Sequence, residues 1–257
     1  MELNPSNYYS VEANQTYMSA SLIKSMLNCE AAAIAEARGE WTRPDSTALL
    51  VGSYLDAKFD SDLAFNNWMK EHPEVLKRDG TLKAEYQQAE RMYERVRKDP
   101  VFFYYTFIGF TQHILTGEID GVPFKAKLDF YVPDERIVDL KTVRSFDSVY
   151  LPGKGRVSFA EAWNWPLQMA IYQELEGHHL PCYLAVITKE DPCDYDVIEV
   201  PQSVMDAEMD LLRSKLPRLE AIWNGSIEPD RCGHCAYCRE TKKLERPTSL
   251  LEYEWNE

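Results

Sequence analysis

The sequence has no apolar run of roughly 18 residues or more, so it offers no candidate for a membrane-spanning helix. Its first ten residues, MELNPSNYYS, lack the basic-then-apolar order of a secretory signal. Internal repeats and low-complexity tracts are also missing, which argues against repeat architectures and biased, disordered segments. These absences predict a soluble protein of the cytoplasm that makes no contact with a membrane.

Positive charge is scarce as well. The chain carries 28 Lys and Arg against 42 Asp and Glu, a formal net charge of -14. This balance argues against a protein that coats nucleic acid through a basic surface. It does not exclude a nuclease whose carboxylates are covered by metal ions and whose basic residues gather locally. With 257 residues, 45% of them hydrophobic, the chain can bury the core of one large domain, alone or with an appended lobe.

Cysteines are present in an unusual arrangement. Three of the six lie at Cys232, Cys235 and Cys238. In a cytosolic chain such crowding favours a metal or cluster over disulfides. Thiolates at every third residue can surround one soft metal centre, yet three leave it one ligand short. Cys29, on the inward stripe of a predicted helix, is the candidate fourth ligand.

Hydrophobic spacing predicts helices for most of the first hundred residues. We expect residues 1–18 to form a loosely attached lead-in, and Ser19 or Ser21 to cap the first helix. The predicted elements are helices at 22–41, 46–69 and 81–100, followed by one or more aromatic-rich strands at 101–119.

The segment 117–142 has the pattern of paired strands. Asp120-Gly121 is a dipeptide typical of tight hairpin turns. Polar residues then alternate with apolar ones up to Asp129, and after a second turn Asp139 and Lys141 share one face of the next strand. If these strands pair, the two carboxylates and the ammonium converge. A solvated face with an ordinary ion pair is the alternative interpretation.

The second half of the chain alternates helices and strands. Ser158 has the spacing of a capping box, and Pro166 marks either a kink or a fresh helix start. Gln168 and Tyr172 then lie on one helical face. Beyond a helix end at Gly177, we expect strands at 182–189 and 194–200 and a long amphipathic helix at 201–225.

Two acids and a lysine suit the hydrolysis of a phosphodiester with Mg²⁺ or Mn²⁺. Such a cation prefers oxygen ligands and keeps several waters, so Asp129 and Asp139 with the carbonyl of Leu140 would suffice. Lys141 could orient or help deprotonate the attacking water, or neutralise the phosphate.

These residues carry a resemblance to a known superfamily. Asp129 followed by Asp139-Leu140-Lys141 resembles the PD-(D/E)XK nuclease signature. Gln168-Met-Ala-Ile-Tyr172 resembles the Q-x-x-x-Y element of its RecB-like branch, and Gly52-Ser-Tyr-Leu-Asp56 lies where that branch carries G-x-x-x-H. Over residues 19–240 the chain most closely resembles the phage and prophage exonucleases related to exodeoxyribonuclease VIII (RecE-like).

The resemblance implies an α/β fold with a restriction-endonuclease-like core, in which helices flank a mixed β-sheet. It implies one nuclease domain at residues 19–240, between the lead-in and a tail at 241–257. Asp129 and Asp139 would be metal ligands and Lys141 the catalytic lysine, with Gln168 and Tyr172 orienting the DNA phosphate or the lysine. Asp56 replaces the usual histidine, and its carboxylate could still ligate Mg²⁺ or Mn²⁺.

The same branch includes members in which one early cysteine and a late trio hold a [4Fe–4S] cluster. By this resemblance Cys29, Cys232, Cys235 and Cys238 would clasp the N-terminal helix to the C-terminal region. The alternative is Zn²⁺ held by the same four cysteines, or with His234 in place of one of them.

The resemblance also implies DNA as substrate. We expect Lys125 and Lys127 to contact phosphate beside the metals, and Arg144, Lys154 and Arg156 to grip the backbone from a loop. The expected function is an exonuclease, bacterial or phage-encoded, that resects duplex ends for recombination and passes single strands to an annealing protein. A homo-oligomer encircling DNA would explain processive cleavage. The alternatives are an endonuclease, an end-trimming nuclease of the CRISPR-adaptation kind, and a binding or interaction module without catalysis.

Overall fold

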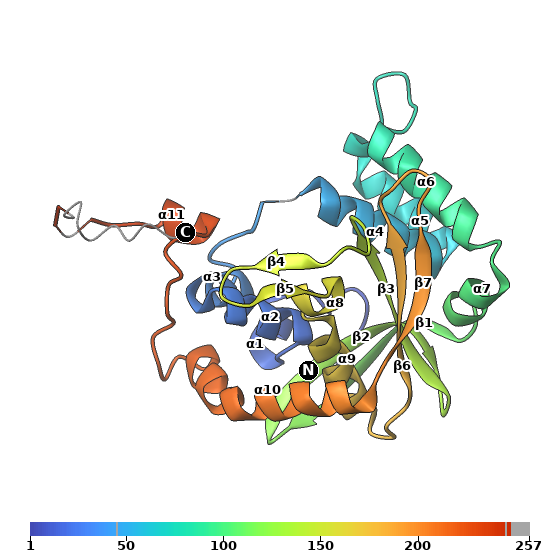
Figure 1. The fold of residues 1–257 in the computed structure, drawn as a ribbon. Coiled ribbons are helices and arrows are strands. Elements are labelled where there is room, and N and C mark those ends of the chain that lie inside the picture. The colour runs from blue at the N-terminus through green and yellow to red at the C-terminus, as the bar shows by residue number, and fades with distance from the viewer. Residues whose placement is uncertain (45, 245, 248–257) are drawn as a thin grey trace.

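The structure is a computed structural model that describes residues 1–44, 46–244 and 246–247. A five-stranded sheet in the order β1-β2-β3-β6-β7 forms its centre, with helices on both faces (Figure 1). β3 and β6 run parallel, whereas the other neighbouring pairs in this sheet are antiparallel. This mixed sheet between helices is the α/β fold expected from the sequence. Among the helices of the described chain, none is both long and apolar enough to cross a bilayer.

The strands of the central sheet are β1 (Phe110–Ile119), β2 (Val122–Val132), β3 (Arg136–Val143), β6 (Cys182–Thr188) and β7 (Tyr195–Val200), and β4 (Val149–Leu151) pairs with β5 (Gly155–Val157). The helices are α1 (Val11–Thr16), α2 (Ala20–Asn28), α3 (Glu30–Ala37), α4 (Thr47–Asp60), α5 (Asp62–Glu71), η1 (Pro73–Val75), α6 (Ala84–Val96), α7 (Pro100–Thr106), α8 (Phe159–Ala162), α9 (Trp165–Glu176), α10 (Gln202–Trp223) and α11 (Ala236–Glu240).

Alternating side chains of the sheet divide between two buried cores. Ile137 of β3 packs into a core with residues of α2, α9 and α10. Its neighbour Val138 packs into the opposite core, with residues of α4, α6 and α7. Burial on both faces explains why β6 is apolar on both sides rather than half polar, whereas β3 also carries Asp139 and Lys141.

The predicted hairpin is present. Asp120 and Gly121 join β1 to β2, and both have positive φ, at 50° and 83°, as a two-residue hairpin turn requires. β2 then pairs with β3, but the paired residues end at Phe130 and Val138. The next residues, Asp129 and Asp139, therefore lie where the two strands separate.

The N-terminal lead-in is firmly attached, contrary to expectation. Met18 forms a bridge with Phe124 of β2 and is completely buried. The indole Nε1 of Trp223 donates to the carbonyl of Asn14 at 3.0 Å. The sequence prediction overlooked Tyr8, Ala13 and Met18, which are the buried residues of this segment.

Several predicted elements are shorter than expected. The first helix ends at Asn28, because Cys29 is extended (φ -162°, ψ 106°) and α3 starts after it. The second helix is interrupted in the same way at Ser61, which caps α5. Residues 101–106, predicted as part of a strand, instead belong to helix α7 (Pro100–Thr106), because Asp99 caps this helix and Pro100 occupies its first turn.

The C-terminal half follows the prediction more closely. Ser158 accepts a hydrogen bond from the Glu161 amide, and α9 starts afresh with Pro166 in its first turn. Gly177 ends α9 with φ at 89°, in the left-handed region. Of the predicted tail, 241–257, residues 245 and 248–257 lie outside the described part of the chain.

Candidate functional site

A cleft of about 960 Å³ opens beside the point where β2 and β3 separate. Its wall is formed by the N-terminal segment, α2, α3, α4, α5, β1, β2, β3 and α9. The cleft brings together six of the residues that the sequence singled out: Asp56, Asp129, Asp139, Lys141, Gln168 and Tyr172. The motifs before, within and after the predicted hairpin therefore meet at one place.

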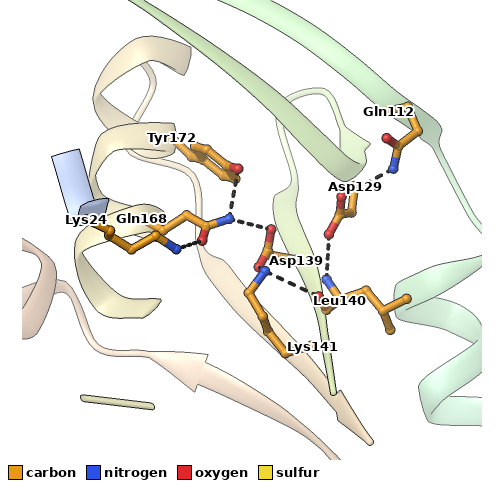
Figure 2. A network of polar contacts seen from close by, with 8 residues as sticks. All are labelled: Lys24, Gln112, Asp129, Asp139, Leu140, Lys141, Gln168 and Tyr172. Carbon is orange, nitrogen blue, oxygen red and sulfur yellow. Dashed lines mark hydrogen bonds and ion pairs between the residues drawn. The ribbon is translucent and has the colours of Figure 1, made fainter. Parts of the chain in front are cut away.

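Asp129 closes the gap between the separating strands. Its Oδ2 accepts a hydrogen bond from the backbone N–H of Leu140 at 2.9 Å, in place of a strand-to-strand bond (Figure 2). Its Oδ1 accepts from Nε2 of Gln112 at 3.2 Å. Gln112 stands opposite Asp129 in the β1–β2 register, is left unpaired there, and has a positive φ of 50°. Such backbone strain is common beside functional sites, although the sequence alone had not pointed to this residue.

Asp139 is almost completely buried, at 1% exposure, and contacts two predicted partners. Gln168 donates from Nε2 to Asp139 Oδ1 at 2.9 Å and to the Tyr172 hydroxyl at 2.8 Å. Lys141 forms an ion pair with Asp139 Oδ2 and also donates to the carbonyl of Leu140 at 3.3 Å. Within the Q-x-x-x-Y element, Gln168 therefore orients the second acid directly, while Tyr172 contacts Gln168.

Lys24 is a site residue that the sequence did not indicate. It extends from α2 and donates from Nζ to Gln168 Oε1 at 2.6 Å (Figure 2). The Gln168 amide therefore has its oxygen held by Lys24 and its nitrogen held by Asp139 and Tyr172. Burial, together with the nearby charge of Lys141, lowers the pKa of Lys24 to about 8. A lysine on an otherwise ordinary amphipathic helix gives no sequence signal for this role.

Two of the carboxylates, Asp56 and Asp129, have a raised pKa. Burial, and then the charge of Asp139, raises the pKa of Asp56 to about 6, while Lys141 opposes this shift. Burial and the charges of Asp139 and Asp56 raise the pKa of Asp129 well above its usual value. Burial by itself would lower the pKa of Lys141, but the negative charges of Asp139 and Asp129 outweigh it, so the pKa is raised. Three acids lie close together in a largely buried cleft. A bound cation would therefore stabilise their ionised forms.

This donor set fits a hard divalent cation. Asp139 Oδ2 is buried and has no hydrogen-bond partner among the described residues, although Lys141 is ion-paired with it. Asp129 and Asp56 reach the same cleft as oxygen donors. Mg²⁺ and Mn²⁺ prefer such carboxylate oxygens and complete their shells with water. The Leu140 carbonyl, predicted as a ligand, accepts a hydrogen bond from Lys141 here.

The predicted DNA contacts divide into three cases. Lys127 lines the cleft and is half-buried. Lys125 also lines the cleft, but its Nζ donates to the Tyr8 carbonyl at 2.5 Å and to Asn14 Oδ1 at 2.8 Å. Its ammonium therefore anchors the N-terminal segment and is not free to bind a phosphate. The remaining predicted contacts, in the loop and in β5, are Arg144, Lys154 and Arg156. All three are exposed, and none is among the cleft-lining residues of the described chain.

The four predicted cysteines gather at a second site. Their sulfur atoms all lie within 4.8 Å of one another, with Cys29 Sγ 3.6 Å and Cys232 Sγ 3.9 Å from Cys238 Sγ. Burial acts against the Cys232 thiolate, but hydrogen bonds from the His234 and Cys235 amides lower the pKa of Cys232 to about 6. This group can bind a soft metal centre, and it joins the start of α3 to α11.

His234 is exposed and directs Nδ1 at the Cys232 carbonyl at 2.8 Å. It does not belong to the group of four sulfurs found in the described chain. Cys182 is buried in the core that contains Ile137, and Cys193 in the core that contains Val138.

The chain matches the family described as "PDDEXK-like domain of unknown function (DUF3799)" over residues 19–241. The crystal structure of a putative exonuclease from Eubacterium rectale has a TM-score of 0.93 and 36% identity, covering 98% of this chain and 97% of that chain. The crystal structure of SSO0001 is 18% identical, covers 78% of this chain and 85% of that chain, and has a TM-score of only 0.32, which supports no conclusion. No curated protein matches the chain.

The family match includes every residue of the acidic cleft that comes from α2, α4, β2, β3 and α9, as well as all four clustered cysteines. Because this match extends over most of the sequence, the chain belongs to the PDDEXK-like family DUF3799.

Proposed function

We propose that this protein is a metal-dependent DNA exonuclease. The observation that carries the proposal is the convergence of Asp129, Asp139 and Lys141 in one cleft. Gln168 of α9 donates to Asp139 and also to the Tyr172 hydroxyl. Membership of a PDDEXK-like family supports nuclease chemistry. The relative from E. rectale, described as a putative exonuclease, supports action at DNA ends.

In this proposal each side chain has a distinct task. Asp129 and Asp139, with Asp56 as a third acid, hold Mg²⁺ or Mn²⁺, which would polarise the phosphate and acidify a water molecule. Lys141 orients that water or balances the charge that develops on the phosphate. Gln168 keeps Asp139 pointing into the cleft, and its own amide is held by Lys24.

Cleavage of linear and circular duplex DNA in Mg²⁺ or Mn²⁺ tests the proposal. An exonuclease degrades the linear form and leaves the covalently closed circle intact. Loss of both forms would instead identify an endonuclease. If neither form were cleaved with either metal, the chain would be a binding or interaction module and the proposal would be wrong.

We further propose that residues 19–240 act as the nuclease domain and that the enzyme resects duplex ends for recombination. The resulting single-stranded tails would be bound by an annealing protein. Resection predicts that a linear duplex acquires tails of one polarity before it is fully degraded, which end-labelling of either strand detects. An end-trimming nuclease would stop after a fixed short length.

Light scattering of the purified chain, alone and with DNA, tests for a homo-oligomer.

We also propose that the four cysteines hold a metal centre that clasps α3 to α11. The resemblance to RecB-like nucleases favours a [4Fe–4S] cluster, in which each thiolate binds a different iron atom. The short sulfur separations favour the alternative, because thiolates on one zinc ion at about 2.3 Å lie about 3.8 Å apart. Iron analysis and visible absorbance of anaerobically prepared protein distinguish the two centres.

A further inference from the structure

Part of the cleft wall is built by a segment that the family motifs do not include. We call residues 5–18 the N-terminal strap. Tyr8, Tyr9 and Asn14 of this strap line the cleft together with the acidic residues. The strap is attached at its far end, where Met18 bridges to Phe124 of β2. It is therefore part of the site rather than an appendage beside it.

Lys125 fixes the middle of the strap. Its side chain is 1% exposed, and its ammonium binds the Tyr8 carbonyl and Asn14 Oδ1 while lying 4.7 Å from the centre of the Tyr8 ring. A buried ammonium is costly unless its hydrogen bonds are satisfied. Moving the strap away would leave this charge without its partners, so Tyr8 and the residue next to it are held in place.

Tyr9, the residue that follows Tyr8 in the strap, is exposed. It remains 71% exposed, although its ring meets the Tyr8 ring edge-on at 5.0 Å and the Lys127 ammonium lies 4.6 Å from its centre. An aromatic ring therefore lies at the cleft, in contact with Tyr8 and Lys127, with most of its surface available. Lys127 stands two residues before Asp129 on β2, a separation of about 7 Å along the strand.

We propose that Tyr9 is a stacking platform for an unpaired base of the DNA strand whose phosphate lies at Asp129 and Asp139. Lys127, which touches the Tyr9 ring, pairs with an adjacent phosphate. The inference rests on the proposed nuclease function and specifies its substrate as a single-stranded or frayed end, because the bases of an intact duplex have their faces covered by their neighbours. Stacking on an aromatic ring is sequence-tolerant. It also needs no net positive charge, which suits a chain of net charge -14.

The test measures DNA binding in a Lys141→Met background, so that Mg²⁺ can be present without the cleavage expected of the active site. The probe is a fluorescein-labelled duplex with a short single-stranded end, followed by fluorescence anisotropy. Tyr9→Ala should weaken binding about tenfold or more, whereas Tyr9→Phe keeps the ring and should stay within about twofold. Phe110→Ala is the matched control, because Phe110 is 58% exposed on β1 and is not among the cleft-lining residues of the described chain.

Replacing single overhang nucleotides by abasic ones tests the same contact from the DNA side, with the protein unchanged. At one position the abasic nucleotide should weaken binding to the Tyr9 protein about as much as Tyr9→Ala does. At that position Tyr9→Ala should show no further loss, because the stacking contact is already missing. The loss should persist at raised salt, unlike the loss caused by Lys127→Met, which screening diminishes.

Two results would overturn the inference while leaving the nuclease function intact. One is a Tyr9→Ala protein that binds the overhang as tightly as its parent. The other is an equal loss for Tyr9→Phe and Tyr9→Ala, which would assign the contact to the hydroxyl. A wild-type chain that neither binds nor cleaves DNA would overturn the proposed function together with the inference.

Discussion

At the scale of single residues, the site is a connected set of hydrogen bonds rather than a row of independent ligands. Gln168 lies at its centre, because its amide contacts Asp139, Tyr172 and Lys24 at once. Since all the polar atoms of this amide are engaged, its orientation is determined. A change at one partner should therefore affect the acid on the other side.

Lys24 offers a direct check of this connection. Lys24→Met should lower kcat about tenfold with little change in KM, because Gln168 loses the partner that fixes its amide while the DNA contacts remain. Lys24→Arg, which can still donate to Gln168 Oε1, should recover part of the rate. Lys215→Met, at an exposed position of α10, is the control for loss of a positive charge. Equal activity of Lys24→Met and the control would show that the contact has no role.

The raised pKa values predict how stability depends on pH without metal. The fold favours the protonated form of Asp56, so its contribution to stability is complete below about pH 4 and is lost as pH rises through about 6. Asp129, whose pKa is also raised, acts in the same direction. In EDTA the Tm of the wild type should therefore fall as the pH is raised from 4.5 to 7. The fall should be smaller for Asp56→Asn, by about 2 °C or more.

Mg²⁺ added at pH 7 should restore the wild-type Tm, because the cation replaces the missing protons. Asp210→Asn, an exposed acid of α10, should keep the wild-type pH profile. A wild-type Tm that is flat over this range in EDTA, or that does not respond to Mg²⁺, would show that the acids do not form one cation site.

At the scale of elements, the separation of β2 from β3 creates the site. Pairing ends at Phe130 and Val138, and the Asp129 carboxylate takes over the Leu140 amide. The strands and their alternation could be predicted from the sequence because period-two patterning is a local property. The splayed register, and the unpaired Gln112 opposite Asp129, could not, because they depend on contacts between strands.

The helix boundaries show the same division between local and distant causes. Ser158 and Gly177 were predictable, since capping acts within a few residues. The break at Cys29 was missed, because residues 22–41 have a nearly continuous helical pattern. This break belongs to a tertiary arrangement, in which the extended Cys29 backbone places its sulfur beside Cys238. The strap, predicted as loosely attached, is held by Lys125, whose anchoring role no local pattern reveals.

The cysteine site predicts a stabilising clasp between α3 and α11. Cys235→Ser should abolish metal binding and lower Tm, because the C-terminal region loses the metal–thiolate bonds that attach it to the N-terminal helices. His234→Ala should retain the metal, since His234 lies outside the sulfur group. The measurements are iron and zinc content per chain, absorbance near about 400 nm, and thermal unfolding. Metal retained at full occupancy by Cys235→Ser would contradict the assignment.

At the scale of the whole molecule, acidic residues outnumber basic ones, 42 to 28. The net charge of -14 gives little general attraction for DNA, so binding depends on local features. The cleft contains three such features: the carboxylates proposed to hold a divalent cation, Lys127 and Lys141 on β2 and β3, and the exposed ring of Tyr9. The fold class was predictable because these motifs occur in family order, whereas the relation between strap and cleft required the structure.

Cleavage of an end-labelled linear duplex in Mg²⁺ or Mn²⁺ tests the central claim most directly. The wild type should degrade the duplex, and EDTA should stop the reaction. Asp139→Asn should be slower by about a hundredfold or more, because it removes a buried ligand charge while keeping the side-chain shape. Asp210→Asn, an exposed acid of α10, should cleave at the wild-type rate. Equal rates for Asp139→Asn and the wild type would contradict the assignment of this cleft as the active site.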